Sequence, residues 1–313
     1  MAAPGWTLTD APAQHGRTAV VTGANTGLGL ETAHGLARLG ASVVLACRNV
    51  DAAKTAREQI LADLPEAQID IVELDLSSLE SVRTAADELN GRDGTIDLVV
   101  ANAGVMASRH TLTADGFELD FGTNFLGHHA FIGLLMPRVL DVAGRVVTVG
   151  STAGRAGVID FDDLPFEHRF SGARAYSRAK FAQMVFAVEL QRRLEAAGAS
   201  ALSVAAHPGA TRTGVMREQT PFLRWAFTSP RMRWLLDLFV MDVADGALPT
   251  LRAATDPDVL GGEYFGPSGP LQFTGSPRRV DVSDKVLDPQ LGQRLWTTAE
   301  ELTRVVYPFG SRG

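Results

Sequence analysis

Short apolar runs alternate with longer helical patterns through the first two-thirds of the chain. The expected strands cover residues 18–22, 42–46, 69–74, 96–100, 145–149 and 201–205. Helical patterns fill the intervals, over residues 29–39, 51–64, 79–89, 117–140 and 175–197. The apolar runs lack strict alternation, which is typical of strands that are buried on both faces. This order of elements indicates right-handed βαβ units and a parallel sheet.

The rest of the chain carries a weaker pattern, with a seventh strand expected at 263–265 and a closing helix at 291–306. No linker rich in Pro, Gly or Ser, no charge block and no repeat divides the 313 residues. We therefore expect a single α/β domain over residues 17–313, preceded by an N-terminal extension, 1–16. Its fold would be of the Rossmann type, a doubly wound and mostly parallel sheet of about seven strands with helices on both faces.

Net charge, cysteine content and hydropathy limit the kinds of partner and the location that the sequence favours. The net charge of −7 argues against nucleic acid and anionic membranes. Cys47 is the one cysteine, so no intramolecular disulfide can form. Residues 1–17 lack the pattern of a signal peptide, and no apolar run is long enough to span a bilayer. We expect a cytoplasmic protein without a metal, because His207 has no cluster of further ligands.

The first expected strand ends in a glycine-rich turn, Thr22 to Gly29, with the spacing G-x-x-x-G-x-G. Such a turn lets the backbone approach a pyrophosphate, and the next helix offers free N–H groups. Glycines also simply form turns, so the prediction depends on the position between a strand and a helix. The predicted cofactor contacts here are Gly23, Asn25, Thr26, Gly27 and Leu28.

The second expected strand ends at Cys47-Arg48. Folds that bind NAD usually place an Asp or Glu near this point to hold the ribose hydroxyls. Cys47 cannot act as a carboxylate and is interpreted as a small buried side chain, whereas Arg48 can bind a 2′-phosphate. We therefore expect NADP(H) in preference to NAD(H). The alternative for Arg48 is a solvated arginine at a strand end.

The later strand ends bring further residues to the same edge of the sheet. After the third strand, Asp75 with Leu76 could accept a hydrogen bond from an adenine amino group, or Asp75 could cap the next helix. After the fifth strand, Ser151 places a hydroxyl in the crevice. The other expected contacts, after the fourth and sixth strands, are Asn102, Ala103, Gly104, Pro208, Gly209 and Thr213.

Tyr176 and Lys180 are four residues apart in an expected helix, which puts both side chains on one face. A neighbouring ammonium favours the phenolate and lowers a tyrosine pKa from its usual ~10. A tyrosine made acidic in this way can exchange a proton with a carbonyl or alcohol oxygen. Tyrosine and lysine also occur four apart as ordinary surface pairs, so the interpretation depends on the surrounding crevice.

Taken in order, these motifs resemble the short-chain dehydrogenase/reductase family over roughly residues 17–215. The matching set is the glycine turn, Asp75-Leu76, Asn102-Ala-Gly104, Asn124, Ser151, Tyr176-Ser-Arg-Ala-Lys180 and Pro208-Gly209 with Thr213. The chain is most similar to the branch of retinol dehydrogenases and WW-domain oxidoreductases. That similarity lies in Ala24-Asn25-Thr26, Leu45-Ala-Cys-Arg48, Phe121-Gly-Thr-Asn124-Phe-Leu-Gly-His128 and an insertion at 159–166. This insertion makes the interval from Ser151 to Tyr176 longer than is usual in the wider family.

The resemblance implies a role for each matching residue. Tyr176 would be the general acid in reduction and the base in oxidation, and Lys180 would lower its pKa and bind the nicotinamide ribose. Ser151 would polarise the substrate oxygen, and Asn124 would hold a water that links Lys180 to solvent. Thr213 would contact the nicotinamide carboxamide. The resemblance also suggests a homodimer or homotetramer through the helices that hold Asn124 and Tyr176.

The segment 211–241 is expected to form a flap on the substrate side, with aromatic and aliphatic residues mixed with arginines over 221–241. It could be a lid over a bulky apolar substrate, a packed helix or, least favoured, a helix in contact with a membrane. We expect an NADP(H)-dependent oxidoreductase that interconverts a carbonyl and an alcohol on a bulky apolar substrate. The alternatives are a family member acting on a sugar, a polyketide or a C=C bond, and a nucleotide-sensing scaffold without turnover.

Overall fold

The computed structural model describes residues 5–211 and 241–309, and its centre is an eight-stranded sheet. The strand order is β3-β2-β1-β4-β5-β6-β7-β8, and only β7 and β8 pair antiparallel within it. The strands are β1 (Thr18–Thr22), β2 (Ser42–Cys47), β3 (Ile69–Glu73), β4 (Leu98–Ala101), β5 (Arg145–Val149), β6 (Leu202–Ala206), β7 (Tyr264–Pro267) and β8 (Pro277–Arg279). The chain changes direction across the sheet between β1 and β4, which places a ligand crevice at their carboxyl ends.

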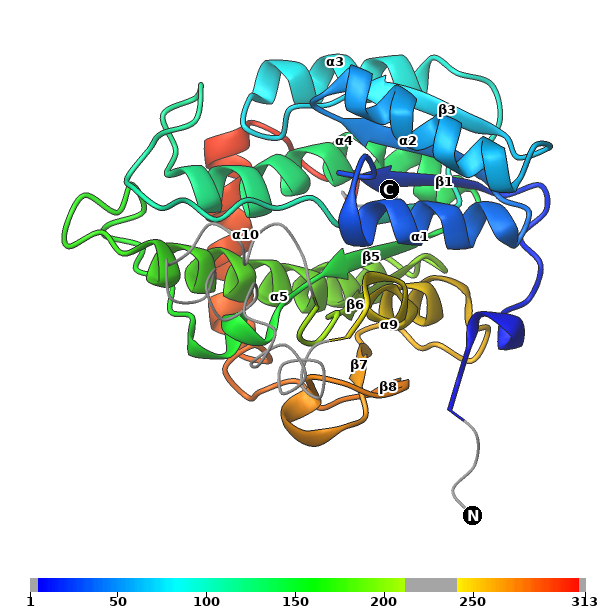
Figure 1. The fold of residues 1–313 in the computed structure, drawn as a ribbon. Coiled ribbons are helices and arrows are strands. Elements are labelled where there is room, and N and C mark those ends of the chain that lie inside the picture. Colours follow the sequence, from blue (N-terminus) through cyan, green and yellow to red (C-terminus); the bar gives the residue numbers. More distant parts are fainter. Residues whose placement is uncertain (1–4, 212–240, 310–313) are drawn as a thin grey trace.

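Helices cover both faces of this sheet (Figure 1). One face carries α1 (Gly27–Arg38), α2 (Val50–Asp63) and α9 (Val243–Thr255). The other carries α3 (Leu79–Asn90), α4 (Gly127–Asp141) and α5 (Gly172–Ala196), with α10 (Pro289–Thr303) packed outside α4 and α5. Each face has its own apolar cluster, and the predicted doubly wound α/β fold is confirmed.

The inner strands β1, β4 and β5 are largely apolar without alternation because both of their faces are covered. In β1, Val20 packs with the cluster under α3, α4 and α5, and Val21 packs with the cluster under α1, α2 and α9. Both side chains are fully buried. Small residues let the helices approach the sheet closely, as Ala33 does in α1 and Ala53 does in α2.

Three parts of the architecture differ from the sequence prediction. The expected helix at 117–140 is instead a π-helical turn, η2 (Phe121–Leu126), followed by α4. Helix α9 and strand β8 were not expected, so the sheet has eight strands rather than about seven. Pro249 lies inside α9 and is unusual in a helix, so it weakens the helical pattern there. Strand β8 has only three residues, which is too short for a recognisable strand pattern.

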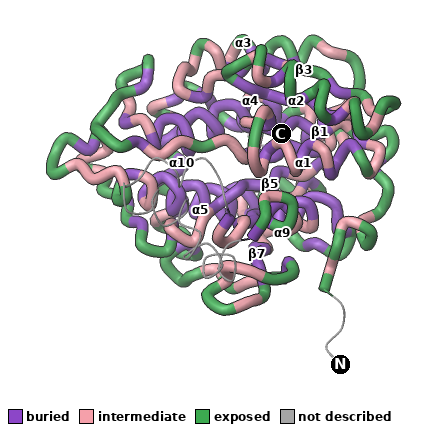
Figure 2. The backbone as a smooth tube through the Cα atoms, viewed as in Figure 1, coloured by how far each residue is buried: buried purple, intermediate pink, exposed green. Residues whose placement is uncertain are grey.

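Helix α10 packs an aromatic cluster against α4 and α5. Trp296 is 2% exposed and stacks on Phe186 of α5, with ring centres 5.7 Å apart. Tyr307 lies 4.5 Å from the Trp296 ring and donates a hydrogen bond to the carbonyl of His129 in α4. Figure 2 shows α4 and α5 as mostly buried. The helices that the resemblance suggested for subunit contact are thus partly covered by their own chain.

The N-terminal residues from Gly5 onward pack on the domain. Trp6 and Leu8 contact the apolar cluster under α1, α2 and α9, and the Gln14 N–H donates to the carbonyl of Leu39 at 2.7 Å. Among the residues that the structure describes, no helix combines the length and apolar character needed to cross a bilayer.

Candidate active site

Tyr176 and Lys180 lie one turn apart on α5, with Lys180 Nζ 5.8 Å from the centre of the Tyr176 ring. The Lys180 side chain is 4% exposed, and its Nζ donates a hydrogen bond to the carbonyl of Val149 at 2.9 Å. Because Val149 is the last residue of β5, this bond holds the ammonium at the carboxyl edge of the sheet. The pairing that the spacing predicts is present, and β5 fixes its position.

Burial dominates the protonation of this pair. It raises the pKa of Tyr176 to about 12, against a hydrogen bond with Ser151 that lowers it. Burial also lowers the pKa of Lys180 to about 8. The sequence predicts an acidic tyrosine, but in the structure the pKa is raised, because the loss of water around the phenol outweighs the hydrogen bond with Ser151 and the Asp120 charge adds to the increase. Tyr176 is therefore a neutral phenol at neutral pH, the form that can donate a proton.

Ser151 lies two residues after the end of β5, and its hydrogen bond with Tyr176 lowers the pKa of the phenol. Its Oγ also accepts the N–H of Ala153 at 3.2 Å, at the start of the short helix η3 (Thr152–Ala156). The Ser151 hydroxyl thus both caps η3 and contacts Tyr176. The long interval before Tyr176 does not separate the two residues in space.

Asn124 is fully buried in η2. Its side-chain amide pairs with Val105 in both directions, accepting the N–H at 2.8 Å and donating to the carbonyl at 2.9 Å. A Cβ added at Gly104 would lie 3.4 Å from Asn124 Oδ1 and 3.6 Å from Lys180 Nζ. Asn124 and Lys180 therefore flank Gly104, in the loop that follows β4.

The glycine turn after β1 has the geometry of a phosphate cradle. Gly23 and Gly27 adopt φ angles of +64° and +58°, which side chains disfavour. A Cβ at Gly29 would lie 2.3 Å from the carbonyl oxygen of Gly23, so the turn packs against the start of α1. Thr26 precedes α1 without forming a side-chain cap within the described part of the chain. The first N–H groups of α1 therefore remain open to an anion.

The hydroxyl of Thr22 ties this turn to the neighbouring loop. Its Oγ accepts the N–H groups of Asn102 and Ala103, each at 2.9 Å, and Asn102 Nδ2 donates to the Thr22 carbonyl at 2.8 Å. Thr22 Oγ also lies 2.9 Å from Nε2 of His128, whose Nδ1 donates to the carbonyl of Asn124. Burial lowers the pKa of His128 to about 4, so the ring is neutral and Nε2 accepts from Thr22. The Thr22 hydroxyl thus connects the glycine turn after β1 and the loop after β4 to the helix that contains Asn124.

At the end of β2, Arg48 is exposed while Cys47 is 1% exposed. Burial raises the pKa of the Cys47 thiol to about 11, as expected for a small packing residue. Asn49 caps α2 by accepting the N–H of Ala52 at 2.9 Å. Arg48 has no hydrogen-bond or ion-pair partner among the residues that the structure describes, and it lies next to the glycine turn that β1 brings alongside.

Asp75 does not cap the helix that follows it, because Ser78 does, by accepting the Ser81 N–H at 3.3 Å. Asp75 Oδ1 instead accepts the N–H and the hydroxyl of Ser77, at 2.9 and 2.6 Å. Leu76 is 5% exposed, and its carbonyl would lie 2.3 Å from a Cβ at Gly127. The described part of the chain places no donor on the second oxygen of Asp75, and Leu76 packs against the start of α4.

After β6, the backbone turns sharply at Pro208-Gly209, where Gly209 has a φ of +68°. His207 is fully buried, with Nε2 2.9 Å from Gln272 Oε1, which agrees with a packing role. The described residues hold no group of three or more His, Cys, Asp or Glu side chains placed to bind a metal ion. Thr213 and nearly all of the expected flap, 212–240, lie outside the described residues.

The family model for short chain dehydrogenase matches residues 17–223. The chain belongs to the short-chain dehydrogenase family. Within it, the chain is 36% identical to retinol dehydrogenase 12 of Mus musculus over 291 residues, which cover 92% of this chain and 86% of that protein. It is 34% identical to retinol dehydrogenase 13 of Homo sapiens, with 94% and 86% covered. The resemblance to the retinol dehydrogenase branch is confirmed.

Solved structures support the same fold for this short-chain dehydrogenase. An uncharacterised protein from Mycobacterium paratuberculosis is 38% identical, with a TM-score of 0.80 and coverage of 97% of this chain and 100% of that chain. A protein described as an NAD(P)-dependent gluconate 5-dehydrogenase from Beutenbergia cavernae, solved with bound NADP, is 25% identical. Its TM-score is 0.61, and the match covers 80% of this chain and 95% of that chain.

Three charged residues near the site of this short-chain dehydrogenase were not predicted from the sequence. Glu118 and Asp120 are fully buried ahead of η2, and Arg178 is 2% exposed between Tyr176 and Lys180 on α5. Arg178 NH2 lies 3.1 Å from Glu118 Oε2. These three residues could have been found from their position in the sequence. Charged residues inside otherwise apolar helical segments are usually buried only when they are paired.

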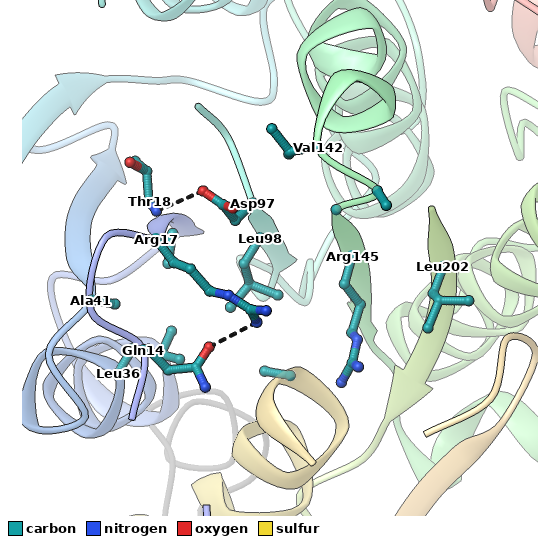
Figure 3. Close-up of a pocket in the computed structure, with 14 residues that line it drawn as sticks. Gln14, Arg17, Thr18, Leu36, Ala41, Asp97, Leu98, Val142, Arg145 and Leu202 are labelled. Carbon is teal, nitrogen blue, oxygen red and sulfur yellow. Dashed lines mark hydrogen bonds between the residues drawn. The ribbon is translucent and has the colours of Figure 1, made fainter. Parts of the chain in front are cut away.

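A cavity of about 100 Å³ lies at the opposite edge of the sheet, at the amino ends of the strands. Figure 3 shows Arg145, the first residue of β5, and Arg17, which precedes β1, facing it, with Asp97 alongside. Arg145 NH1 donates to the carbonyl of Ala253 at 2.7 Å, and Asp97 Oδ2 accepts the N–H of Thr18 at 2.9 Å. These bonds hold α9 and β1 in place, and the cavity is separate from the crevice that contains Tyr176.

Proposed function

We propose that this chain is an NADP(H)-preferring oxidoreductase that interconverts a carbonyl and an alcohol on a bulky apolar substrate. The observation that carries this proposal is the hydrogen bond between Tyr176 and Ser151 beside the Lys180 ammonium. All three groups lie at the carboxyl edge of the sheet, where a doubly wound fold binds its ligand. A neutral phenol held there suits proton transfer to a carbonyl oxygen.

The residues of the crevice fit a dinucleotide. The open N–H groups of α1 and the left-handed glycines Gly23 and Gly27 would hold the pyrophosphate, with Asn25, Thr26 and Leu28 around it. The free oxygen of Asp75, next to Leu76, suits an adenine amino group. The remaining predicted contacts, for the ribose and the nicotinamide, are Asn102, Ala103, Gly104, Pro208, Gly209 and Thr213.

In reduction, Tyr176 Oη would give its proton to the substrate oxygen while Ser151 Oγ holds that oxygen by a hydrogen bond. The phenolate that remains would be stabilised by the Lys180 ammonium and would regain a proton from solvent on the side of Asn124. Bound NADP(H) supplies or accepts the hydride. In oxidation, the same groups would move the proton in the opposite direction.

Two observations support the choice of cofactor and substrate. Arg48 is exposed at the end of β2, and its neighbour there is a buried thiol rather than a carboxylate. The relatives from Mus musculus and Homo sapiens are named for retinol, a bulky apolar alcohol. We therefore place a 2′-phosphate at Arg48 and an apolar alcohol or aldehyde at Tyr176.

The test is a panel of apolar aldehydes and alcohols, sugars, β-ketoesters and enones, followed by the absorbance of NADPH. We expect turnover of apolar carbonyls that is lost in Tyr176→Phe, while NADPH still binds. Tyr307→Phe is the matched control, because it removes a phenol that bonds to His129 away from the crevice. Turnover confined to sugars or enones would favour another substrate class, and tight NADPH binding without turnover would favour a nucleotide-sensing scaffold.

A further inference from the structure

Asp120 is a buried carboxyl group beside the site that the mechanism above does not use. It directly precedes η2, one turn ahead of Asn124, and is fully buried. Its Oδ1 accepts the N–H of Ala107 at 2.8 Å. Its Oδ2 has no hydrogen-bond partner among the residues that the structure describes. A buried carboxylate oxygen without a partner is costly, which points to a charged group that offsets the cost.

The charged and titratable groups that act on Asp120 come from two elements. Glu118 precedes it on the same segment, and its carboxylate is already paired with Arg178 of α5. Lys180 of α5 is the other cation, and its Nζ uses one of its three donors on Val149. Arg178 also acts on Asp120 but is paired with Glu118, so among the described residues Lys180 is the cation that remains to balance Asp120. Tyr176, one turn before Lys180, also experiences the Asp120 charge.

We propose that Asp120 is a positioning residue for proton transfer, whose carboxylate keeps Lys180 in its ammonium form and restrains the ionisation of Tyr176. The directions of the pKa shifts agree with this role. Burial, then Glu118, raises the pKa of Asp120 to about 7, and Lys180 opposes the shift. Burial lowers the pKa of Lys180 to about 8, and Asp120 opposes that shift in turn. The carboxyl is thus charged over the range in which Lys180 would otherwise lose its proton.

The substitution Asp120→Asn removes the charge and keeps an oxygen that can accept the Ala107 N–H. Both Tyr176 and Lys180 then lose a proton more easily, so the direction of the effect does not depend on which of them titrates first. We expect the alkaline limb of the pH–activity profile, which reports loss of the proton from Tyr176 or Lys180, to move to lower pH by on the order of one unit. Below about pH 7, where Asp120 is already protonated, the variant and the wild type should behave alike.

The first experiment rests on the proposed function and measures kcat and kcat/KM against pH for the wild type and Asp120→Asn. Asp97→Asn is the matched control, because its half-buried carboxylate bonds to Thr18 at the far edge of the sheet. A limb displaced only in Asp120→Asn supports the proposal. A loss of activity that is uniform across pH, with the limb in place, shows a merely structural role and overturns it.

The second experiment does not require turnover. Lys54, Lys180 and Lys285 are the lysines of the chain, so ¹³C-lysine NMR can follow each ammonium, with Lys180→Arg assigning the signal. We expect the Lys180 midpoint to fall in Asp120→Asn and to stay in place in Asp97→Asn. An unmoved midpoint overturns the proposal, whereas an inactive enzyme with a displaced midpoint counts only against the proposed function.

If Asp120→Asn does not fold, ¹³C-aspartate NMR of the wild type decides the question. One carboxyl should titrate near pH 7, and the Lys180 signal should respond in the same range. A Lys180 signal that does not change where this carboxyl titrates overturns the proposal.

Discussion

Arg178 and Glu118 form an ion pair of 3.1 Å in the protein interior, with 2% and 0% of their side chains exposed. Arg178 also donates to the carbonyl of Asp163 at 3.0 Å and lies over the rings of Phe121 and Phe166. It therefore joins α5 to the start of η2 and to the insertion that precedes α5. The position of α5, which carries Tyr176 and Lys180, therefore depends on Arg178. This residue lies between the two, and the Tyr–Lys spacing assigns no role to it.

Glu118→Gln should strongly destabilise the protein, because it leaves the Arg178 guanidinium buried without its counter-charge. The expected loss is about 3–5 kcal/mol in the free energy of unfolding, measured by urea denaturation. Glu88→Gln is the control, since Glu88 pairs with Arg92 on the surface and should cost under about 1 kcal/mol. Equal losses in the two variants would contradict the importance of the buried pair.

Arg48→Ala should reduce the preference for NADPH over NADH. The substitution removes the charged hydrogen bonds from the guanidinium to the 2′-phosphate of NADPH, which are worth roughly 10- to 100-fold in affinity. Fluorescence titration gives the two dissociation constants. Arg57→Ala removes another exposed arginine, from α2, and should leave their ratio unchanged. Equal affinities for the two cofactors in the wild type would show that Arg48 does not select between them.

Gly29→Ala should weaken cofactor binding by distorting the glycine turn. Its Cβ would lie 2.3 Å from the Gly23 oxygen and 2.5 Å from Asn102 Nδ2, so both cofactor loops would have to move. We expect at least a roughly tenfold weaker affinity for NADPH in a fluorescence titration, about 1.4 kcal/mol. Gly91→Ala is the control, because its Cβ would meet the Asp87 oxygen only at 3.4 Å. Unchanged NADPH binding in Gly29→Ala would show that the turn is not the cradle.

The positions of the predicted crevice residues could be read from the sequence because they depend on local structure. Each predicted contact lies within a few residues of a strand end, as Gly23 does after β1 and Ser151 does after β5. Apolar runs covered on both faces are also distinctive, which made β1 and β5 easy to place. Tyr176 and Lys180 were found for the same reason, since one helical turn fixes their spacing.

The properties that depend on distant packing could not be predicted. The pKa of Tyr176 is raised rather than lowered, because burial is a property of the assembled fold and is not visible in the Tyr–Lys spacing. The partnership of Arg178 with Glu118 spans 60 residues of sequence. The π-helical turn at Asn124 has no pattern of its own, because it differs from an α-helix only in how the backbone closes.

Trp296→Ala should open a cavity between α10 and the two helices below it. The ring contacts Phe186 and Tyr307, and Arg193 lies over it at 4.3 Å. We expect a loss of about 3–5 kcal/mol, seen as a lower melting temperature and urea midpoint. Val306→Ala, at a side chain that is 76% exposed in the same region, should change little. If the two variants melted alike, α10 would not be part of the core.

Acid should destabilise the protein through its buried histidines. Burial lowers the pKa of His128 and His207 to about 4 and that of His129 to about 3, from 6.5. These pKa values are depressed in the folded state, so below pH 6.5 the unfolded chain binds more protons and stability falls. Asp120 acts in the opposite direction, because its raised pKa favours folding as the pH falls from about 7, but it is one group against three.

Urea denaturation at pH 7 and pH 5 checks this dependence, with a steeper loss expected for the wild type than for His129→Leu. Each histidine removed should lower the slope by about 1.4 kcal/mol per pH unit. Stability that is equal at the two pH values would show that the histidines ionise without unfolding.

The covering of α5 by α10 has a consequence for the newly made chain. Helix α5 ends at residue 196 and α10 begins at residue 289, so α5 leaves the ribosome long before its cover exists. At ordinary rates of translation the delay is roughly 5–20 s. During that time Phe186 and its apolar neighbours have no aromatic partner from α10. Nascent chains at this stage should be the form that chaperones bind and that aggregates most readily.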